Sequence, residues 1–228
     1  MKRTPYQLDG APKRPASTLK TRPKKVALVA KGASCQSFVH ESLGVVGQKF
    51  PFDEVWTLNR GYKAFMHNKV FIMDDLRWLQ VRDPIHANEL KKHNRPIITS
   101  TVYPEWPTAV AFPYQDVLEK LSDDIFNVNT VSYMVAYAIY IGVEELSIYG
   151  ADFWYPGSDM SERGGQAVAY MLGIAHGHGM HHRLPHTTSL LYSNSVQFNP
   201  DGTNRGRPPY GYHRTSDEEM ANAANKSA

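Results

Sequence analysis

The sequence predicts an α/β fold in which a mostly parallel sheet is flanked by helices within a single domain. Short apolar runs alternate with stretches of helical pattern, which is typical of βαβ units. The apolar runs end at glycine, asparagine or aspartate, the residues that form turns and ligand sites at the carboxyl ends of parallel strands. With 228 residues, the chain is long enough to bury one sizeable core.

The elements follow in order along the chain. Four apolar runs predict strands in its first half, at 25–30, 54–59, 70–74 and 96–100. The stretch "YQDVLEKL" (114–121) predicts a short helix or a loop. A longer helix is predicted at 130–141; it is apolar nearly all round and therefore buried. A strand at 145–150, a helix at 162–176 and a short strand in "HHRLP" (181–185) complete the prediction.

Charge and composition divide the chain into three parts. Residues 1–25 hold eight Lys and Arg against one acid, Asp9, although the formal net charge of the whole chain is only +3. We therefore expect a basic, unfolded leader at 1–24, a nucleotide-binding or transferase domain at 25–195 and an extended segment at 196–228. The leader has two interpretations: a solvated arm that binds nothing, and an arm that contacts nucleic acid by displacing counterions.

Composition also limits the location of the protein. Mean hydropathy is −0.45, and no apolar stretch reaches the roughly 18 residues that would span a membrane. The basic start of the chain is not followed by the apolar core of a secretory signal. The single cysteine, Cys35, allows no internal disulfide and suits a reducing compartment. These features predict a cytoplasmic protein without a membrane span.

The loop after the first predicted strand is the first candidate site. It reads Lys31-Gly32-Ala33-Ser34 and lacks both the dinucleotide fingerprint and the P-loop motif. Small residues and a lysine at a helix start suit an anion, through free N–H groups and the helix dipole. A plain turn is the alternative interpretation.

Two further groups could hold a metal ion. Asp74 and Asp75 follow a predicted strand, as do the paired aspartates of metal-dependent glycosyltransferases, but they could equally cap a helix. Five histidines surround a glycine-rich turn and the last strand, along which successive side chains point apart: His176, His178, His181, His182 and His186. We therefore expect no firmly bound metal or other cofactor.

The stretch "NTVSYMVAYAIYIGVEELSIYGADF" (129–153) resembles the bacterial lipooligosaccharide sialyltransferases in the order of its motifs. That family has a Rossmann-like fold and transfers sialic acid from CMP-sialic acid without a metal. The resemblance, which extends over about residues 25–192, implies a nucleotide-sugar donor. It also implies the residues that bind this donor: Lys31, Gly32, Ala33, Ser34, Asn59, Asn129, Thr130 and Ser189.

The chain departs from that family at several positions. Lys31 and Ala33 stand where the family has Asn and Pro, and the catalytic His of the family falls at Glu162. We expect Glu162 or Asp152 to act as the catalytic base, although Glu162 could instead be a helix first-turn acid. Contacts to the sugar or acceptor are expected from three further residues: Trp154, Tyr155 and Arg163.

The segment "SERGGQAVAYMLGIAHGHGMHHRLPHTTSLL", with "PPYGYHR" after it, also resembles phage-encoded relatives of unassigned activity. The predicted function is a nucleotide-sugar-dependent glycosyltransferase that acts on a glycan or, in a phage, on a modified DNA base. One alternative is a non-catalytic nucleotide- or DNA-binding module. Another is an ATP- and Mg²⁺-dependent, pyrophosphokinase-like transferase in which Asp74 and Asp75 bind the metal.

Overall fold

Seven parallel strands form one sheet in the computed structural model, which describes residues 22–43, 49–122, 124–153 and 159–191, with the backbone alone for 159–162. The strand order is β5-β4-β3-β2-β1-β6-β7. The strands are β1 (Lys25–Val29), β2 (Glu54–Leu58), β3 (Lys69–Ile72), β4 (Ile97–Thr99), β5 (Ala109–Ala111), β6 (Glu145–Tyr149) and β7 (His181–Arg183). The predicted α/β class with a parallel sheet is confirmed.

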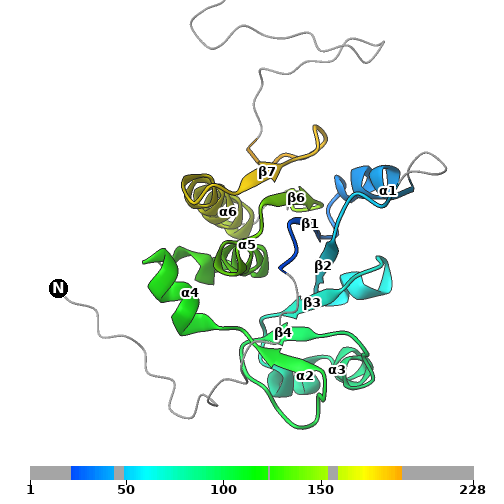
Figure 1. The fold of residues 1–228 in the computed structure, drawn as a ribbon. Coiled ribbons are helices and arrows are strands. Elements are labelled where there is room, and N and C mark those ends of the chain that lie inside the picture. Colours follow the sequence, from blue (N-terminus) through cyan, green and yellow to red (C-terminus); the bar gives the residue numbers. More distant parts are fainter. Residues whose placement is uncertain (1–21, 44–48, 123, 154–158, 192–228) are drawn as a thin grey trace, which may run out of the picture.

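Helices cover both faces of this sheet (Figure 1). On one face lie α4 (Tyr114–Leu121), α5 (Thr130–Ile141) and α6 (Asp159–Gly177), and on the other lies α1 (Cys35–Leu43). Two shorter helices, α2 (Leu76–Arg82) and α3 (Pro84–Lys91), pack together beside β3 and β4. The 3₁₀ turns η1 (Asn59–Lys63) and η2 (Ile125–Val128) complete the described elements.

The core follows the alternation of side chains along buried parallel strands. In β1, Val26 and Leu28 pack in the cluster that contains α5 and α6, whereas Ala27 and Val29 pack with Phe38 of α1. All four β1 residues are fully buried, as the continuous apolar run predicts. Because α5 lies between the sheet and the neighbouring helices α4 and α6, it is buried nearly all round, and this prediction is confirmed.

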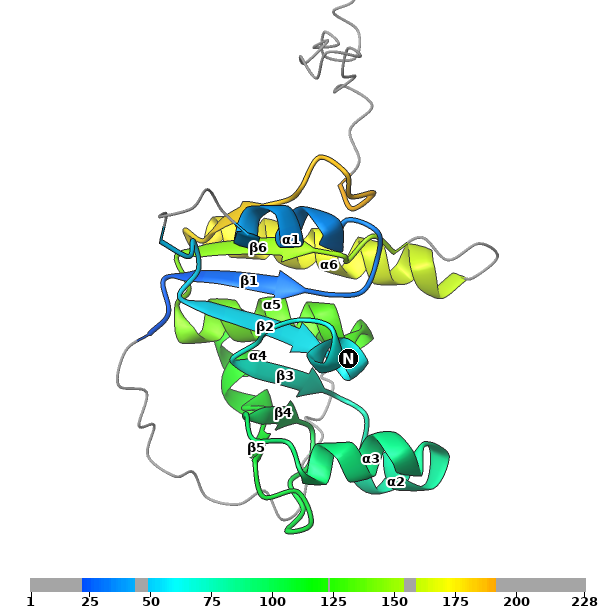
Figure 2. The same ribbon diagram turned by 90° about the vertical axis from the view of Figure 1, so that its right-hand side faces the viewer.

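The sheet has its topological switch point between β1 and β6. Strands β2 to β5 extend the sheet in succession on one side of β1, and the chain then crosses through α5 to place β6 and β7 on the other side. Figure 2 shows the arrowheads of β1, β2 and β3 at one edge of the sheet, with α2 and α3 beyond the ends of β3 and β4. In open α/β sheets, ligands bind at this edge, beside the switch point.

Several elements differ from the prediction. The stretch 114–121 is a helix, α4, rather than a loop, and α6 begins three residues earlier than expected, at Asp159. Strand β5 and helices α2 and α3 were not predicted; β5 has only three residues and lies at the sheet edge, partly exposed. Most of the basic leader and the segment 196–228 lie outside the described residues. No helix among the described residues is long and apolar enough to cross a membrane.

Candidate functional site

The loops after β1 and β6 are joined by a hydrogen-bonded cluster of Ser34 and Asp152. The backbone N–H of Ser34 donates to Oδ2 of Asp152 at 2.9 Å, and the Ser34 hydroxyl donates to Oδ1 at 2.5 Å. The same hydroxyl accepts the N–H of Gly150 at 2.8 Å. Since Ser34 is fully buried, this cluster fixes the two loops at the switch point.

Two glycines allow the loops to approach this closely. The N–H of Gly32 donates to the carbonyl of Gly150 at 2.8 Å, and a Cβ at Gly32 would lie 2.5 Å from Oδ2 of Asp152. Gly150 has a φ of +69°, and a Cβ there would lie 2.3 Å from the carbonyl oxygen of Ala30. Both positions therefore exclude a side chain.

The cluster limits what the loop 31–34 offers to a phosphate. The Asp152 carboxylate takes the Ser34 N–H that a phosphate oxygen would need, and Gly150 takes the N–H of Gly32. Among the residues described, no partner is found for the N–H groups of Lys31 and Ala33. Both Asp152 oxygens accept hydrogen bonds from Ser34, so Asp152 positions the loop; its role as a catalytic base stays a prediction.

The N-terminus of α5 connects to the start of α6. The Oδ1 of Asn129 accepts the N–H of Ser132 at 3.0 Å, and its Nδ2 donates to the carbonyl of Gly164 at 3.2 Å. The Phe153 ring fills the space beside Gly164, where an added Cβ would lie only 2.8 Å from the ring. Asn129 is thus committed to capping α5 and to holding α6. Thr130 is the first residue of α5 and is half-buried.

The remaining predicted site residues differ in whether they contact the cluster of Ser34 and Asp152. The Ser189 hydroxyl donates to the backbone carbonyl of Asp152 and so belongs to the cluster. Arg163 lies exposed on α6, one residue before Gly164. Trp154 and Tyr155 lie outside the described residues, as does the side chain of Glu162, whose backbone lies in α6.

A polar pocket of about 210 Å³ lies at the carboxyl ends of β1, β2 and β3. Three of its residues, Lys31, Asn59 and Asp74, follow these strands, and Asn59 has a left-handed φ of +49°. Such a backbone is uncommon outside glycine, although Asn tolerates it better than most residues. We name this the β1–β3 pocket; its lining residues are Lys31, Asn59, Arg60, Asp74, Leu79, Arg82, Asp83 and His86.

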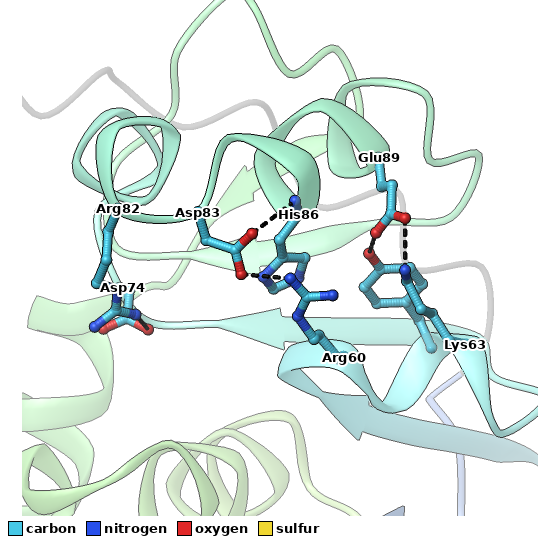
Figure 3. A network of polar contacts seen from close by, with 8 residues as sticks. Arg60, Lys63, Asp74, Arg82, Asp83, His86 and Glu89 are labelled. Carbon is cyan, nitrogen blue, oxygen red and sulfur yellow. Dashed lines mark hydrogen bonds and ion pairs between the residues drawn. The ribbon is translucent and has the colours of Figure 1, made fainter.

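Ion pairs organise the wall of the β1–β3 pocket (Figure 3). Arg60 from η1 donates to the carboxylate of Asp83, which caps α3 by accepting the N–H of His86 at 3.1 Å. These two contacts, with Arg60 as the stronger cause, lower the pKa of Asp83. Arg82 lies 3.6 Å from the carboxylate of Asp74.

His86 is the most deeply buried titratable side chain in this wall. It is 5% exposed, and its ring stacks on that of Tyr62 with 5.8 Å between centroids and 19° between planes. Burial first, and the charge of Arg60 second, lower the pKa of His86 below its usual 6.5. The imidazole is therefore neutral at pH 7.

The two consecutive aspartates have different environments. Asp75 caps α2, where its Oδ1 accepts the N–H groups of Arg77 and Trp78, both at 2.9 Å, and its other oxygen accepts the Tyr103 hydroxyl. The capping interpretation is thus confirmed for Asp75, whereas Asp74 lines the pocket. Over the described part of the chain, no group of three or more His, Cys, Asp and Glu residues could hold a metal ion, and the five C-terminal histidines form no such group.

Four polar residues of the pocket were missed by the sequence analysis: Arg60, Arg82, Asp83 and His86. A signal for two of them is present in "RDPIHANEL" (82–90). An Asp followed by Pro is a frequent helix start, with Asp at the N-cap and Pro at the first helical position. Applied here, this rule would have started α3 at Pro84 and placed His86 in its first turn.

No protein-family model matches the sequence, and no curated protein matches it. Solved structures of the sialyltransferase CstII from Campylobacter jejuni are similar to this chain. Its complex with CMP-3FNeuAc has 16% identity, covers 88% of this chain and 99% of CstII, and gives a TM-score of 0.49. Its complex with cytidine-5'-monophosphate has 18% identity, the same coverages and a TM-score of 0.47.

Proposed function

We propose that the protein is a nucleotide-sugar-dependent glycosyltransferase with its donor at the carboxyl edge of β1, β2, β3 and β6. One observation carries the proposal: residues from the ends of three successive parallel strands line one polar pocket, beside a closed glycine turn at the switch point. Polar groups gathered at this edge are the usual ligand site of open α/β sheets. The order of sequence motifs that resembles the sialyltransferases also supports the proposal.

In this proposal, some residues contact the donor and others hold the loop that carries them. Lys31 and Asn59 lie at the ends of neighbouring strands, where they can contact the donor, while Ser34 and Asp152 hold the loop that carries Lys31. In the transfer, the acceptor oxygen forms a bond to the anomeric carbon of the sugar, and a base takes the proton of the acceptor hydroxyl. The bond between that carbon and the phosphate oxygen breaks, and its electron pair leaves with the nucleotide. Glu162 is the proposed base, and the reaction would take place in the cytoplasm.

A panel of CMP-, UDP- and GDP-sugars tests this function, with and without Mg²⁺. We expect at least one donor to raise the melting temperature, because a ligand that binds only the folded chain stabilises it. We also expect slow release of free nucleotide. Asn59→Ala should weaken both effects, whereas Asn94→Ala, an exposed change between α3 and β4, should not. If no donor binds or releases nucleotide, the proposal fails; an effect seen only with ATP and Mg²⁺ would support the pyrophosphokinase-like alternative.

The proposed acceptor is a modified base in phage DNA, and the basic leader supports this choice. Eight Lys and Arg residues in the first 25 would contact the phosphate backbone. Deletion of residues 1–24 should weaken retention on a DNA column at low salt. Retention equal to that of the full chain would contradict a DNA acceptor, and a glycan would then be the acceptor to test.

A further inference from the structure

One residue that lines the β1–β3 pocket has a buried polar atom without a partner among the described residues. His86 lines this pocket and is 5% exposed. Its Nε2 is buried, and none of the described residues forms a hydrogen bond with it. An unpaired buried nitrogen destabilises the folded chain, because it has lost its hydrogen bonds to water. A ligand group that bonds to Nε2 would therefore be stabilised at this position.

The charged groups of the pocket leave one cation uncompensated. Arg60 pairs with Asp83, and Arg82 lies beside Asp74. Lys31 is exposed and forms no ion pair with any residue that the structure describes. The pocket has three cations and two carboxylates, so the positive charge at Lys31 is available to an anionic ligand.

Donors reach the pocket from three elements: Lys31 follows β1, Arg60 lies in η1 and His86 lies in α3. Figure 3 shows Arg60 extending from η1 toward Asp83, with the imidazole of His86 behind its guanidinium. One Arg60 nitrogen bonds to Asp83, and a guanidinium has five N–H donors in all, so others remain. Donors from three sides suit a tetrahedral anion with three terminal oxygens better than a planar carboxylate with two.

We propose that the β1–β3 pocket binds a phosphate group, with Lys31, Arg60 and the Nε2–H of His86 as its donors. Asp83 and Asp74 hold the two arginines in position without filling the donor capacity of Arg60. The neutral imidazole supplies an N–H without a further charge. The identity of the molecule that carries the phosphate rests on the proposed function. This molecule is either the nucleotide donor or a phosphorylated acceptor. Binding of phosphate itself requires no transfer.

Titration of the full chain with inorganic phosphate tests the site, with acetate and chloride at equal ionic strength as reference anions. We expect phosphate to bind more tightly than either. Lys31→Gln should weaken phosphate binding by about tenfold, since it removes a charge-assisted hydrogen bond. Lys92→Gln removes the same charge at an exposed position outside the pocket and should leave binding unchanged. Equal binding of acetate, or equal loss in both variants, would overturn the proposal.

Nitrogen-15 NMR of the histidine side chains tests the role of His86. Phosphate should shift the His86 Nε2 signal in the wild type, and His86→Gln should remove that signal and weaken phosphate binding. If His86→Gln fails to fold, the wild-type shift decides alone: an unchanged His86 signal at saturating phosphate would overturn the proposal.

Nucleoside monophosphates and sugar phosphates distinguish the two sources of the phosphate. Tighter binding of the nucleotide than of phosphate assigns the pocket to the donor, and tighter binding of the sugar phosphate assigns it to the acceptor. Each of these results supports a phosphate site if Lys31→Gln weakens the binding of the ligand concerned. Equal binding of phosphate, nucleotide and sugar phosphate supports it on the same condition. If the protein binds phosphate but turns over no nucleotide-sugar, the proposed transferase function is rejected and the proposed phosphate site stands.

Discussion

Ser34→Ala is expected to destabilise the protein because Ser34 links the loops after β1 and β6. Its hydroxyl donates to Asp152 at 2.5 Å and accepts the N–H of Gly150 at 2.8 Å, and the side chain is fully buried. Loss of a hydrogen bond to a charged group costs about 1.5–3 kcal/mol, and the unpaired Gly150 N–H costs about 1–3 kcal/mol more. The free energy of unfolding should therefore fall by about 2.5–6 kcal/mol, a large part of the total stability of a domain.

Urea unfolding followed by tryptophan fluorescence measures this change, since Trp56 and Trp106 are buried. Ser42→Ala is the matched control; Ser42 lies in α1, where its hydroxyl donates to the nearby Val39 carbonyl. The control should change stability by less than about 0.5 kcal/mol. A double-mutant cycle with Asp152→Ala should show strong coupling. If Ser34→Ala unfolds at the same urea concentration as the control, the two loops are not held together by this cluster.

Three further predictions concern other parts of the same framework. Gly150→Ala should lower the free energy of unfolding by about 3 kcal/mol or more, because the backbone is left-handed and the new Cβ would meet the Ala30 carbonyl at 2.3 Å; urea unfolding measures it, and a loss below 1 kcal/mol would contradict the loop packing. Asn129→Ala should lower the free energy of unfolding by about 1 kcal/mol, because it removes the cap of α5. Urea unfolding measures this change too, and an unchanged free energy would contradict the capping role of Asn129. Asp53 accepts two backbone N–H groups at the start of β1, first that of Lys25, and these lower its pKa. Its stabilisation is therefore present above about pH 4 and is lost as the pH falls through the lower, folded pKa, so the stability difference between wild type and Asp53→Asn should shrink in acid; a difference independent of pH would refute the assignment.

The strands and the buried helix could be predicted because one physical pattern determines each of them. Buried parallel strands need continuous apolar runs, and β1 has one, with all of Val26 to Val29 fully buried. A helix between a sheet and neighbouring helices must be apolar all round, as α5 is. By contrast, the three residues of β5 form a strand only because β4 is beside them, and no local signal marks that neighbour.

The candidate site could be predicted only where it coincides with strand ends. Lys31, Asn59 and Asp74 were expected because each follows an apolar run, and the structure brings them to one pocket. Arg60 and His86 join this pocket through η1 and through α3, neither of which was predicted. Their place depends on how α2 and α3 pack beside β3 and β4, which is tertiary information.

The loop 31–34 combines two roles that the sequence could not separate. Its amides at Gly32 and Ser34 bond to the β6 loop and so hold the switch point closed. A phosphate cradle built from consecutive backbone amides, as in a P-loop, is therefore not formed by these two residues. The exposed Lys31 side chain remains as the cationic contact of the loop to a ligand. Recognition by a partly exposed charge is screened by salt, whereas recognition by buried amides is screened much less. Phosphate affinity should accordingly fall as NaCl rises, and this salt dependence should largely disappear in Lys31→Gln; a dependence that persists in the variant would mean that the arginines, rather than Lys31, attract the anion.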